Sequence, residues 1–281
     1  MSSDTRVTLR EAAERLGVHY MTAYRYVRTG RLPAEREGAR WTVAVADLRR
    51  VQGAPSRPTR PKLAPAERTH RLADRLVAGD EAGAWTIVED AMSSGADPVE
   101  IHTDMLVPAL RTIGDGWERG DLSVADEHRA SVVASRIIGR LGPRFARRGR
   151  TRGTVVLGAP PGEFHALPCA ILADLLRREG FEVADLGADT PAISFADAAT
   201  EADRLVAVLI GVTTPGRDAA VRTVVLTLQR AEIGAPILVG GQGISGRDHA
   251  LSLRADGWTG RDATQAVKAV QALAEGAQSS R

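Results

Sequence analysis

The 281-residue sequence predicts a chain of three domains: a winged helix-turn-helix, a four-helix bundle, and a Rossmann-like α/β domain built on a parallel sheet. Three observations predict this order. Two short helical patterns meet at Gly17, an uninterrupted helical pattern covers residues 65–148, and short apolar runs alternate with amphipathic stretches after residue 149. We therefore expect domains at residues 1–54, 65–148 and 149–281, with a proline-rich, basic linker at residues 55–64.

Composition narrows the class of protein. Hydrophobic residues make up 43% of the chain, and no run of about 18 uncharged apolar residues occurs. The amino terminus lacks the basic head and apolar stretch of a signal peptide. Cys169 is the single cysteine, which excludes an internal disulfide framework and a cysteine-rich metal site. We expect a cytoplasmic protein without a membrane partner.

The charges are unevenly distributed along the chain. Residues 1–63 hold 13 Arg and Lys against 6 Asp and Glu, which gives this region a net charge of +7. Because the whole chain carries +2, the remainder carries −5. A basic amino-terminal region attached to an acidic body is typical of a polyanion-binding domain joined to a second function.

The amino-terminal pattern has the spacing of a helix-turn-helix. A short helix over residues 7–16 ends at Gly17, and a second helix is expected from His19 to Arg28. Burying the apolar side of the second helix leaves four residues pointing outward, where a recognition helix meets base edges: His19, Tyr20, Thr22 and Arg25. Residues 34–43 follow as a two-stranded wing that carries Arg36 and Arg40.

The segment Gly30-Arg-Leu-Pro33, the wing and Val45-Ala-Asp-Leu48 resemble the winged helix shared by MerR-type regulators and phage excisionases. The resemblance covers about fifty residues. It implies binding to a double-stranded DNA operator, with Arg25 near bases and Arg36 and Arg40 near phosphates. The alternative is a helix-turn-helix used for protein contact alone.

The middle of the chain predicts four helices, which together form a small bundle. Leu72 and Leu76 belong to the first helix, and Trp85 and Val88 to the second. The third begins at Asp97-Pro98 and runs to Trp117, and the fourth spans Ser123 to Leu141.

Four buried strands are expected in the last domain, at residues 154–157, 181–186, 205–212 and 236–239, each separated by a helical stretch. This alternation is typical of a parallel, doubly wound sheet, in which ligands bind outside the carboxyl ends of the strands. The loops that follow these strands are therefore the places to look for a site.

One histidine, His165, lies in the loop after the first strand. A lone histidine there is most often a structural hydrogen-bond partner. Glu163, however, lies two residues earlier, where its carboxylate can accept the imidazole proton and fix the tautomer of a metal ligand. Hydroxyl groups and glycines follow two further strands at the same edge, and these allow close approach of a ligand: Thr213, Thr214, Gly240 and Gly241.

Together these residues resemble the cobalamin-binding domain family, with its Asp-x-His-x-x-Gly signature, a Ser or Thr after a later strand, and a late Gly-Gly. The resemblance implies that His165 coordinates cobalt from below and displaces the benzimidazole tail, which enters the sheet past the hydroxyls and glycines. Glu163 replaces Asp and Pro168 replaces Gly in this sequence. Glu retains the carboxylate, and Pro168 suits the first turn of a helix.

The helical region adds a second resemblance. Trp117 precedes Glu127-His128 by nine intervening residues, with Val124 between them, as in the cap of the CarH and LitR light-sensing repressors. The resemblance implies that Trp117, Val124 and Glu127 shelter the adenosyl group of adenosylcobalamin. The best-known light sensors carry a histidine directly after the tryptophan, which captures cobalt after illumination. Glu118 occupies that position here, and a carboxylate is a poorer ligand for corrin cobalt. His128 is a candidate substitute.

The leading interpretation is a transcriptional regulator, of repressor type, in which the state of cobalamin sets self-association and DNA binding, with light as a candidate signal. One alternative is a corrinoid carrier for methyl transfer. Another is a regulator that has lost its cofactor and uses the sheet domain for assembly. We find no Ser-His-Asp arrangement, phosphate loop or catalytic carboxylate pair and therefore do not expect an enzyme.

Overall fold

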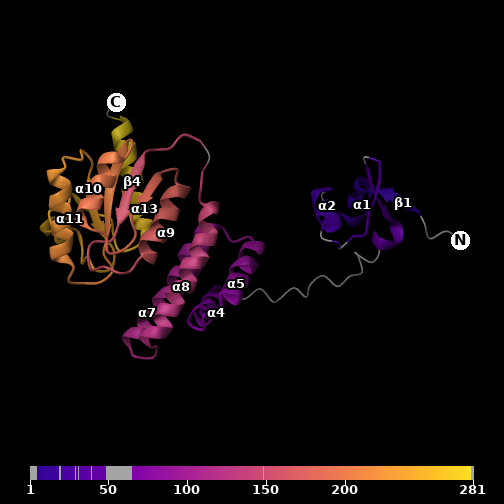
Figure 1. Ribbon diagram of the computed structural model, residues 1–281, viewed down its shortest axis with the longest axis horizontal. Helices are drawn as coiled ribbons and strands as arrows, with labels where there is room; N and C mark the ends of the chain where they lie inside the picture. The colour runs from indigo at the N-terminus through magenta and orange to yellow at the C-terminus, as the bar shows by residue number, and fades with distance from the viewer. Residues whose placement is uncertain are drawn as a thin grey trace. The chain divides into compact units, whose positions relative to one another are not determined.

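The computed structural model describes residues 5–18, 20–28, 30, 32–38, 40–48, 65–147 and 149–279. The chain forms two compact units, residues 1–62 and 63–281 (Figure 1). The predicted linker at residues 55–64 lies outside the described residues, as does His19. No described helix has the length and apolar character needed to cross a membrane.

The first unit is a helix-turn-helix with an antiparallel sheet. Its elements are β1 Arg6–Thr8, α1 Leu9–Leu16, α2 Tyr20–Arg28, β2 Glu35–Glu37 and β3 Arg40–Ala44. The predicted wing is present as β2 paired with β3, while β1, which the sequence pattern missed, pairs with the other edge of β3. The first helix begins at Leu9 because the Thr8 side chain and Glu11 form a capping box, and it ends at Gly17 in a left-handed conformation.

The predicted bundle is confirmed as a helical cap. Its elements are α4 Pro65–Val77, α5 Glu81–Ser93, α6 Pro98–Glu100, η1 Ile101–Leu106, α7 Val107–Glu118, α8 Val124–Leu141 and the short η2 Gly142–Arg144. The predicted third helix is one rod, α6–η1–α7, whose middle turn is a π-helix. Pro108 explains this turn, because proline has no backbone N–H and its ring crowds the carbonyl of the preceding turn.

The last domain is the predicted parallel sheet, with one strand more than expected. Its strands are β4 Thr154–Gly158, β5 Glu182–Asp185, β6 Leu205–Gly211, β7 Ile237–Gly240 and β8 Gly257–Trp258, and every neighbouring pair is parallel in the order β5-β4-β6-β7-β8. The helices are α9 Leu167–Arg178, α10 Ala192–Glu201, α11 Asp218–Arg230, α12 Arg247–Ser252 and α13 Ala263–Ser279. The sheet separates α9 and α13 from α10 and α11 (Figure 1), and each layer has its own apolar core.

The cap packs against helix α9 of the sheet domain. Ile171 and Leu175 of α9 belong to the same buried cluster as Leu141 and Phe145 at the end of the cap. A buried polar contact lies in this interface, because His102 Nε2 and Asp174 Oδ2 are 3.0 Å apart. The base of the cap is thus fixed to the helix that follows the His165 loop.

Candidate functional site

The strand order places a switch point between β4 and β6. The chain passes from β4 outward to β5 and then returns to the other side of β4 as β6. At such a point the loops after the two central strands leave in opposite directions and open a crevice. The loop after β4 carries Glu163 and His165, and the loop after β6 carries Thr213 and Thr214.

Glu163 ties these two loops together. Its side chain is buried, and Oε2 accepts hydrogen bonds from the backbone N–H groups of Thr213, at 2.8 Å, and Thr214, at 2.7 Å. Its Oε1 lies 2.5 Å from His165 Nδ1. Burial raises the pKa of the Glu163 carboxyl, but the hydrogen bonds from His165 and the two backbone N–H groups outweigh it and lower the pKa to about 2. Glu163 is therefore a carboxylate at neutral pH.

His165 is held by one ring nitrogen and open at the other. Nδ1 contacts Glu163 and lies 3.3 Å from the Thr214 hydroxyl, while half of the side chain is exposed. The Glu163 hydrogen bond raises the pKa of His165 above its usual value, against the effect of burial. With Nδ1 engaged, Nε2 is the atom left for a ligand, which is the arrangement of a histidine held for metal coordination.

A cavity of about 190 Å³ opens beside His165 and extends into the sheet domain. Its walls come from β6, α9 and the start of α13, with Val107 and Leu110 of the cap at its border. Glycine keeps it open at one wall, because a Cβ on Gly211 would lie 2.9 Å from Cys169 Sγ. Gly240 and Gly241 line it too, and side chains there would collide with Thr259 and with the Val212 backbone. The cavity suits a flat, largely apolar group.

Three large apolar side chains are exposed, two at the α7–α8 end of the cap and one beside His165. Trp117 at the end of α7 is 47% exposed, Val124 at the start of α8 is 56% exposed, and Phe164 beside His165 is 72% exposed. The negative charge of Glu127 on α8 contributes to the raised pKa of His165, so this carboxylate of the cap acts electrostatically on the imidazole of the sheet domain. Apolar surface of this kind is typical of a ligand-binding face.

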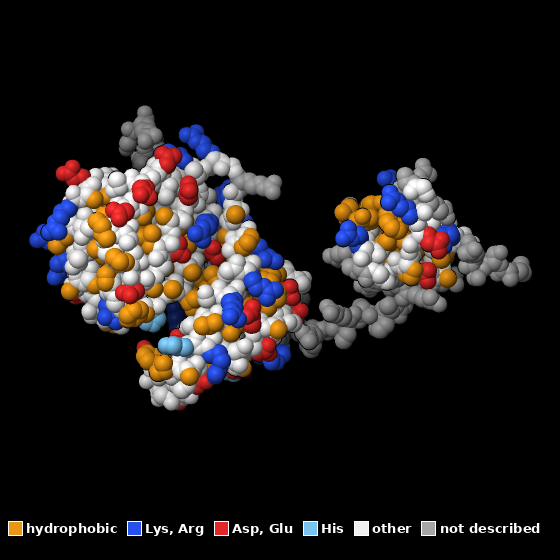
Figure 2. All heavy atoms as spheres, viewed as in Figure 1, with side chains coloured by type: hydrophobic (Ala, Val, Ile, Leu, Met, Phe, Trp, Pro, Cys, Tyr) orange, Lys and Arg blue, Asp and Glu red, His pale blue; other side chains and the backbone are white. Residues whose placement is uncertain are grey.

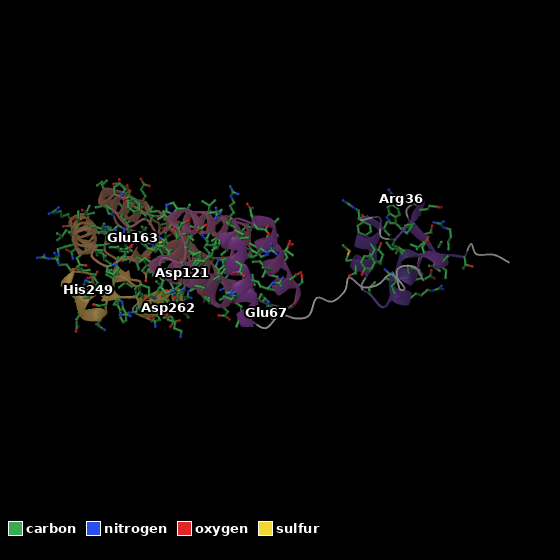
Figure 3. The ribbon with its side chains drawn as sticks, turned by 90° about the horizontal axis from the view of Figure 1, so that it is seen from below. Arg36, Glu67, Asp121, Glu163, His249 and Asp262 are labelled. Carbon is green, nitrogen blue, oxygen red and sulfur yellow. The ribbon has the colours of Figure 1, made fainter. Side chains whose placement is uncertain are left out.

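The space-filling view shows a hollow between the cap and the sheet domain, with histidine side chains on both of its sides and apolar side chains at the tip of the cap (Figure 2). Figure 3 labels Glu163 in the sheet domain and Asp121 in the cap, at the turn between α7 and α8. In the described part of the chain, no three His, Cys, Asp or Glu side chains gather as a metal site of protein ligands would require.

The two other candidate ligands, Glu118 and His128, are both exposed in the cap. Glu118 is exposed at the last residue of α7. The His128 ring is largely exposed, and its Nδ1 lies 2.8 Å from Glu127 Oε2. Glu127 is further fixed by Ser131, whose hydroxyl donates to Oε1 at 2.8 Å. The structure thus groups His128 with Glu127 and leaves Glu118 on the surface.

Sequence reasoning missed several residues of the site. Gly211 and Cys169 line the cavity, although each reads as ordinary strand or helix core. Arg217 lies in the loop after β6, its charge acts on His165, and its buried Nε has no partner among the described residues. The signal for Gly211 was available, because a glycine at the carboxyl end of a buried strand allows a close approach.

In the amino-terminal unit, Tyr20 and Arg36 are exposed and Thr22 is half-buried, on α2 and β2. Arg25 and Arg40 belong to α2 and β3, but their side chains lie outside the described set. Ala23 is buried, with Val18, Tyr26 and Val27 packed around the same core. The apolar side of α2 is therefore the one the sequence predicted.

Comparison with known families identifies the domains. Residues 7–52 match a family described as a helix-turn-helix domain, and residues 69–141 and 153–270 each match a family described as a B12 binding domain. The chain thus contains an amino-terminal helix-turn-helix, a helical B12-binding cap and a Rossmann-like B12-binding domain.

Corrinoid proteins are among the curated relatives of this chain. Trimethylamine corrinoid protein 1 of Methanosarcina acetivorans is 30% identical over 131 residues, which are 46% of this chain and 61% of that protein. The dimethylamine corrinoid protein of Methanosarcina barkeri is 31% identical over 141 residues, 48% of this chain and 64% of that protein. The chain thus spans less than two thirds of the length of these relatives. The solved monomethylamine corrinoid protein of Methanosarcina barkeri shares the fold, with a TM-score of 0.64 and 18% identity over 74% of this chain and 100% of that one.

Proposed function

We propose that this chain, a cobalamin-binding protein with a helix-turn-helix domain, is a transcriptional repressor of the CarH and LitR type. In this proposal it binds adenosylcobalamin between cap and sheet, and the upper ligand of cobalt sets self-association and thereby affinity for a DNA operator. The cytoplasm is the compartment in which such a protein acts. The chain serves as a regulator, without catalysing a reaction.

The observation that carries the proposal is the His165 imidazole, which is held at Nδ1 while about half of its side chain stays exposed. Glu163 engages Nδ1 and leaves Nε2 as the donor, and a narrow apolar cavity lies directly beside it. A corrinoid needs both features, because its cobalt takes a lower nitrogen ligand while its displaced benzimidazole tail needs a slot. The residues present therefore fit the cofactor.

Each part of the site has its own task in this proposal. His165 would hold cobalt through Nε2, Glu163 keeps Nδ1 protonated and the ring oriented, and Thr213 and Thr214 anchor Glu163 through their backbone N–H groups. Gly240 and Gly241 give the tail room beside the sheet. The cofactor supplies a cobalt–carbon bond whose loss changes the group facing the cap.

In this proposal the cap contacts the upper ligand of cobalt. Trp117 and Val124 offer exposed apolar surface at its tip, and Glu127 adds a carboxylate near His165. These residues would cover the upper ligand, and a change of that ligand would favour a different position of the cap and a different state of assembly. Several tethered winged helices bind an operator more tightly than one, through effective concentration.

The proposal is tested by reconstituting the full chain with adenosylcobalamin in darkness and measuring DNA binding before and after illumination. We expect a red protein-bound species and DNA binding that depends on the upper ligand. Arg36→Ala is expected to weaken DNA binding about tenfold without changing the absorption spectrum, because one phosphate contact is lost. DNA binding that is identical with and without cofactor would contradict the regulatory role.

Glu163→Gln is expected to lower cobalamin affinity about 10- to 100-fold while the domain stays folded. Glutamine is as large as glutamate, but it lacks the charge that holds the Nδ1 proton of His165. Titration of the apoprotein with hydroxocobalamin measures the change. Glu201→Gln, at the end of α10, is the matched control and should leave affinity unchanged. Wild-type affinity in Glu163→Gln would remove the carboxylate from the cofactor site.

Trp117→Ala is expected to weaken adenosylcobalamin binding while hydroxocobalamin binding stays near the wild-type level. The reason is that Trp117 would cover the adenosyl group alone, and a buried aromatic contact of this kind contributes about 1–3 kcal/mol. Parallel titrations with the two cofactors measure the selectivity. Val132→Ala, another exposed apolar position on α8, serves as the control. Equal losses for both cofactors would argue against an adenosyl-specific role.

A corrinoid carrier for methyl transfer is the second candidate, favoured by the names of the methylamine corrinoid relatives. It shares the cofactor site and differs in what the amino-terminal unit does. A carrier would bind corrinoid, show no sequence-specific DNA binding, and accept a methyl group on reduced cobalt. Selection of bound sequences from a random DNA pool separates the two functions.

A further inference from the structure

A second pocket lies at the amino-terminal edge of the sheet, opposite the cofactor edge. It occupies about 490 Å³ beside the segment that joins α8 to β4, and the end of α9 and the start of β5 form its other side. The connecting segment crosses this edge in Figure 1. Four arginines line the pocket against two glutamates: Arg147, Arg150, Arg152 and Arg177, with Glu179 and Glu182. None of the residues assigned to the cofactor site lines this pocket.

Two of the arginines, Arg147 and Arg152, converge there. A Cβ placed on Gly180 would lie 3.7 Å from Arg152 Cδ and 3.8 Å from Arg147 Nη1, so both side chains meet above the Gly180 backbone. Gly180 has a φ of 88°, which favours glycine and keeps this floor free of a side chain. Arg152 is further fixed, since its guanidinium lies 4.8 Å from the Phe181 ring centre.

Carboxylates neutralise only part of this group of charges, since Arg177 pairs with Asp174. Within the described part of the chain, neither Arg147 nor Arg150 has an ion-pair partner, and the nearest carboxylate to Arg152 is that of Glu275 at 3.8 Å. Glu179 is engaged by Gln271, whose Nε2 donates to it at 2.6 Å. Like charges held close together repel, and an anion between them relieves that repulsion through charge-assisted hydrogen bonds.

We propose that this pocket binds a small ligand with adjacent phosphate groups, such as a diphosphate or the polyphosphate chain of a nucleotide. Guanidinium groups match phosphate oxygens in pairs, and several arginines spread over a pocket of this size suit more than one phosphate. Residues 64–281 carry a net charge of −5, which repels an extended nucleic acid and favours a small anion in a local basic pocket.

The pocket also connects to the cap. Arg177 donates from Nη1 to Asp174 Oδ1 at 3.2 Å, and Asp174 holds His102 of the cap. An anion that draws Arg177 toward the pocket acts on the joint between cap and sheet. Arg177 is for this reason unsuitable as a test variant, whereas Arg147 and Arg150 are exposed and free of such contacts.

The test is calorimetric titration of the full chain, without corrinoid, using pyrophosphate, orthophosphate and ATP as probes at constant ionic strength. We expect saturable binding of pyrophosphate and ATP and much weaker binding of orthophosphate. The double variant Arg147→Ala/Arg150→Ala is expected to lose about tenfold or more in affinity. Arg222→Ala, an exposed arginine on α11 outside the pocket, should bind as the wild type does.

Three outcomes would overturn the proposal: no saturable binding of pyrophosphate or ATP, equal losses in the double variant and in Arg222→Ala, or loss of duplex DNA binding in the double variant without any phosphate-ligand binding. The last outcome would assign the pocket to nucleic acid. Each is independent of corrinoid uptake, which the absorption spectrum of separately reconstituted samples of the same variants monitors.

Discussion

Replacing His165 with alanine is expected to lower the affinity for cobalamin by more than the roughly 10- to 100-fold that the loss of an outer-shell partner costs. His165 is the one residue that would bond directly to the metal, and Thr214 and Glu163, which contact its ring, offer no imidazole in exchange. Equilibrium dialysis with hydroxocobalamin measures the loss.

A spectroscopic measurement separates loss of the ligand from general damage to the site. In the reduced cobalt(II) form, electron paramagnetic resonance of wild type with isotope-labelled histidine should show coupling to one histidine nitrogen, and this coupling should vanish in any corrinoid that His165→Ala retains. His249→Ala is the control, because His249 pairs with Asp218 at 3.2 Å elsewhere in the same domain. Unchanged uptake and an unchanged spectrum in His165→Ala would refute the site.

The second large effect is expected at the joint between cap and sheet. Asp174→Ala should lower the free energy of unfolding of residues 63–281 by about 3 kcal/mol. Asp174 and His102 are both buried, and His102 Nδ1 has no partner among the described residues, so the substitution leaves the whole imidazole without a hydrogen bond. Stacking of His102 on Phe145, with ring centres 4.6 Å apart, keeps the ring in place.

Asp218→Ala provides a matched comparison, because it also removes the aspartate that pairs with a histidine, in this case His249. The Asp218 side chain is half-exposed, so its loss should cost less than about 1 kcal/mol. Urea unfolding followed by tryptophan fluorescence compares the two variants. Equal stability losses would mean that the buried pair contributes no more than a surface pair.

The sequence predicted the helices of the helix-turn-helix and of the bundle, and the four longer strands of the sheet, because their apolar periodicity matches the packing that the structure shows. It did not predict α12 and α13, which follow the last expected strand. The short elements escaped prediction for a physical reason. β8 has two residues and β1 has three, too few for a period to appear, and both are defined by pairing with β7 and β3. The π turn at residues 101–106 likewise depends on how Pro108 is accommodated.

The sequence predicted which loops form the site, but it did not predict the shape of the cavity between them. The rule that parallel strands end at one edge predicted that the loops carrying His165 and Thr213 meet. The cavity wall at Gly211 and Cys169 depends on how closely α9 packs against β6. These two residues are far apart in the sequence, so no local pattern indicates their contact. The arginine pocket spans the end of α9 and the loop before β4, so its members are scattered among ordinary surface arginines in the sequence.

The three-way anchoring of Glu163 has a consequence for the speed and entropy of uptake. Because one carboxylate already joins the loop after β4 to the loop after β6, the chain loses the freedom of both loops when it folds, before any ligand arrives. Docking should then proceed with little further loss of backbone freedom, and amide hydrogen exchange at residues 213 and 214 should be slow in the empty protein and change little on loading.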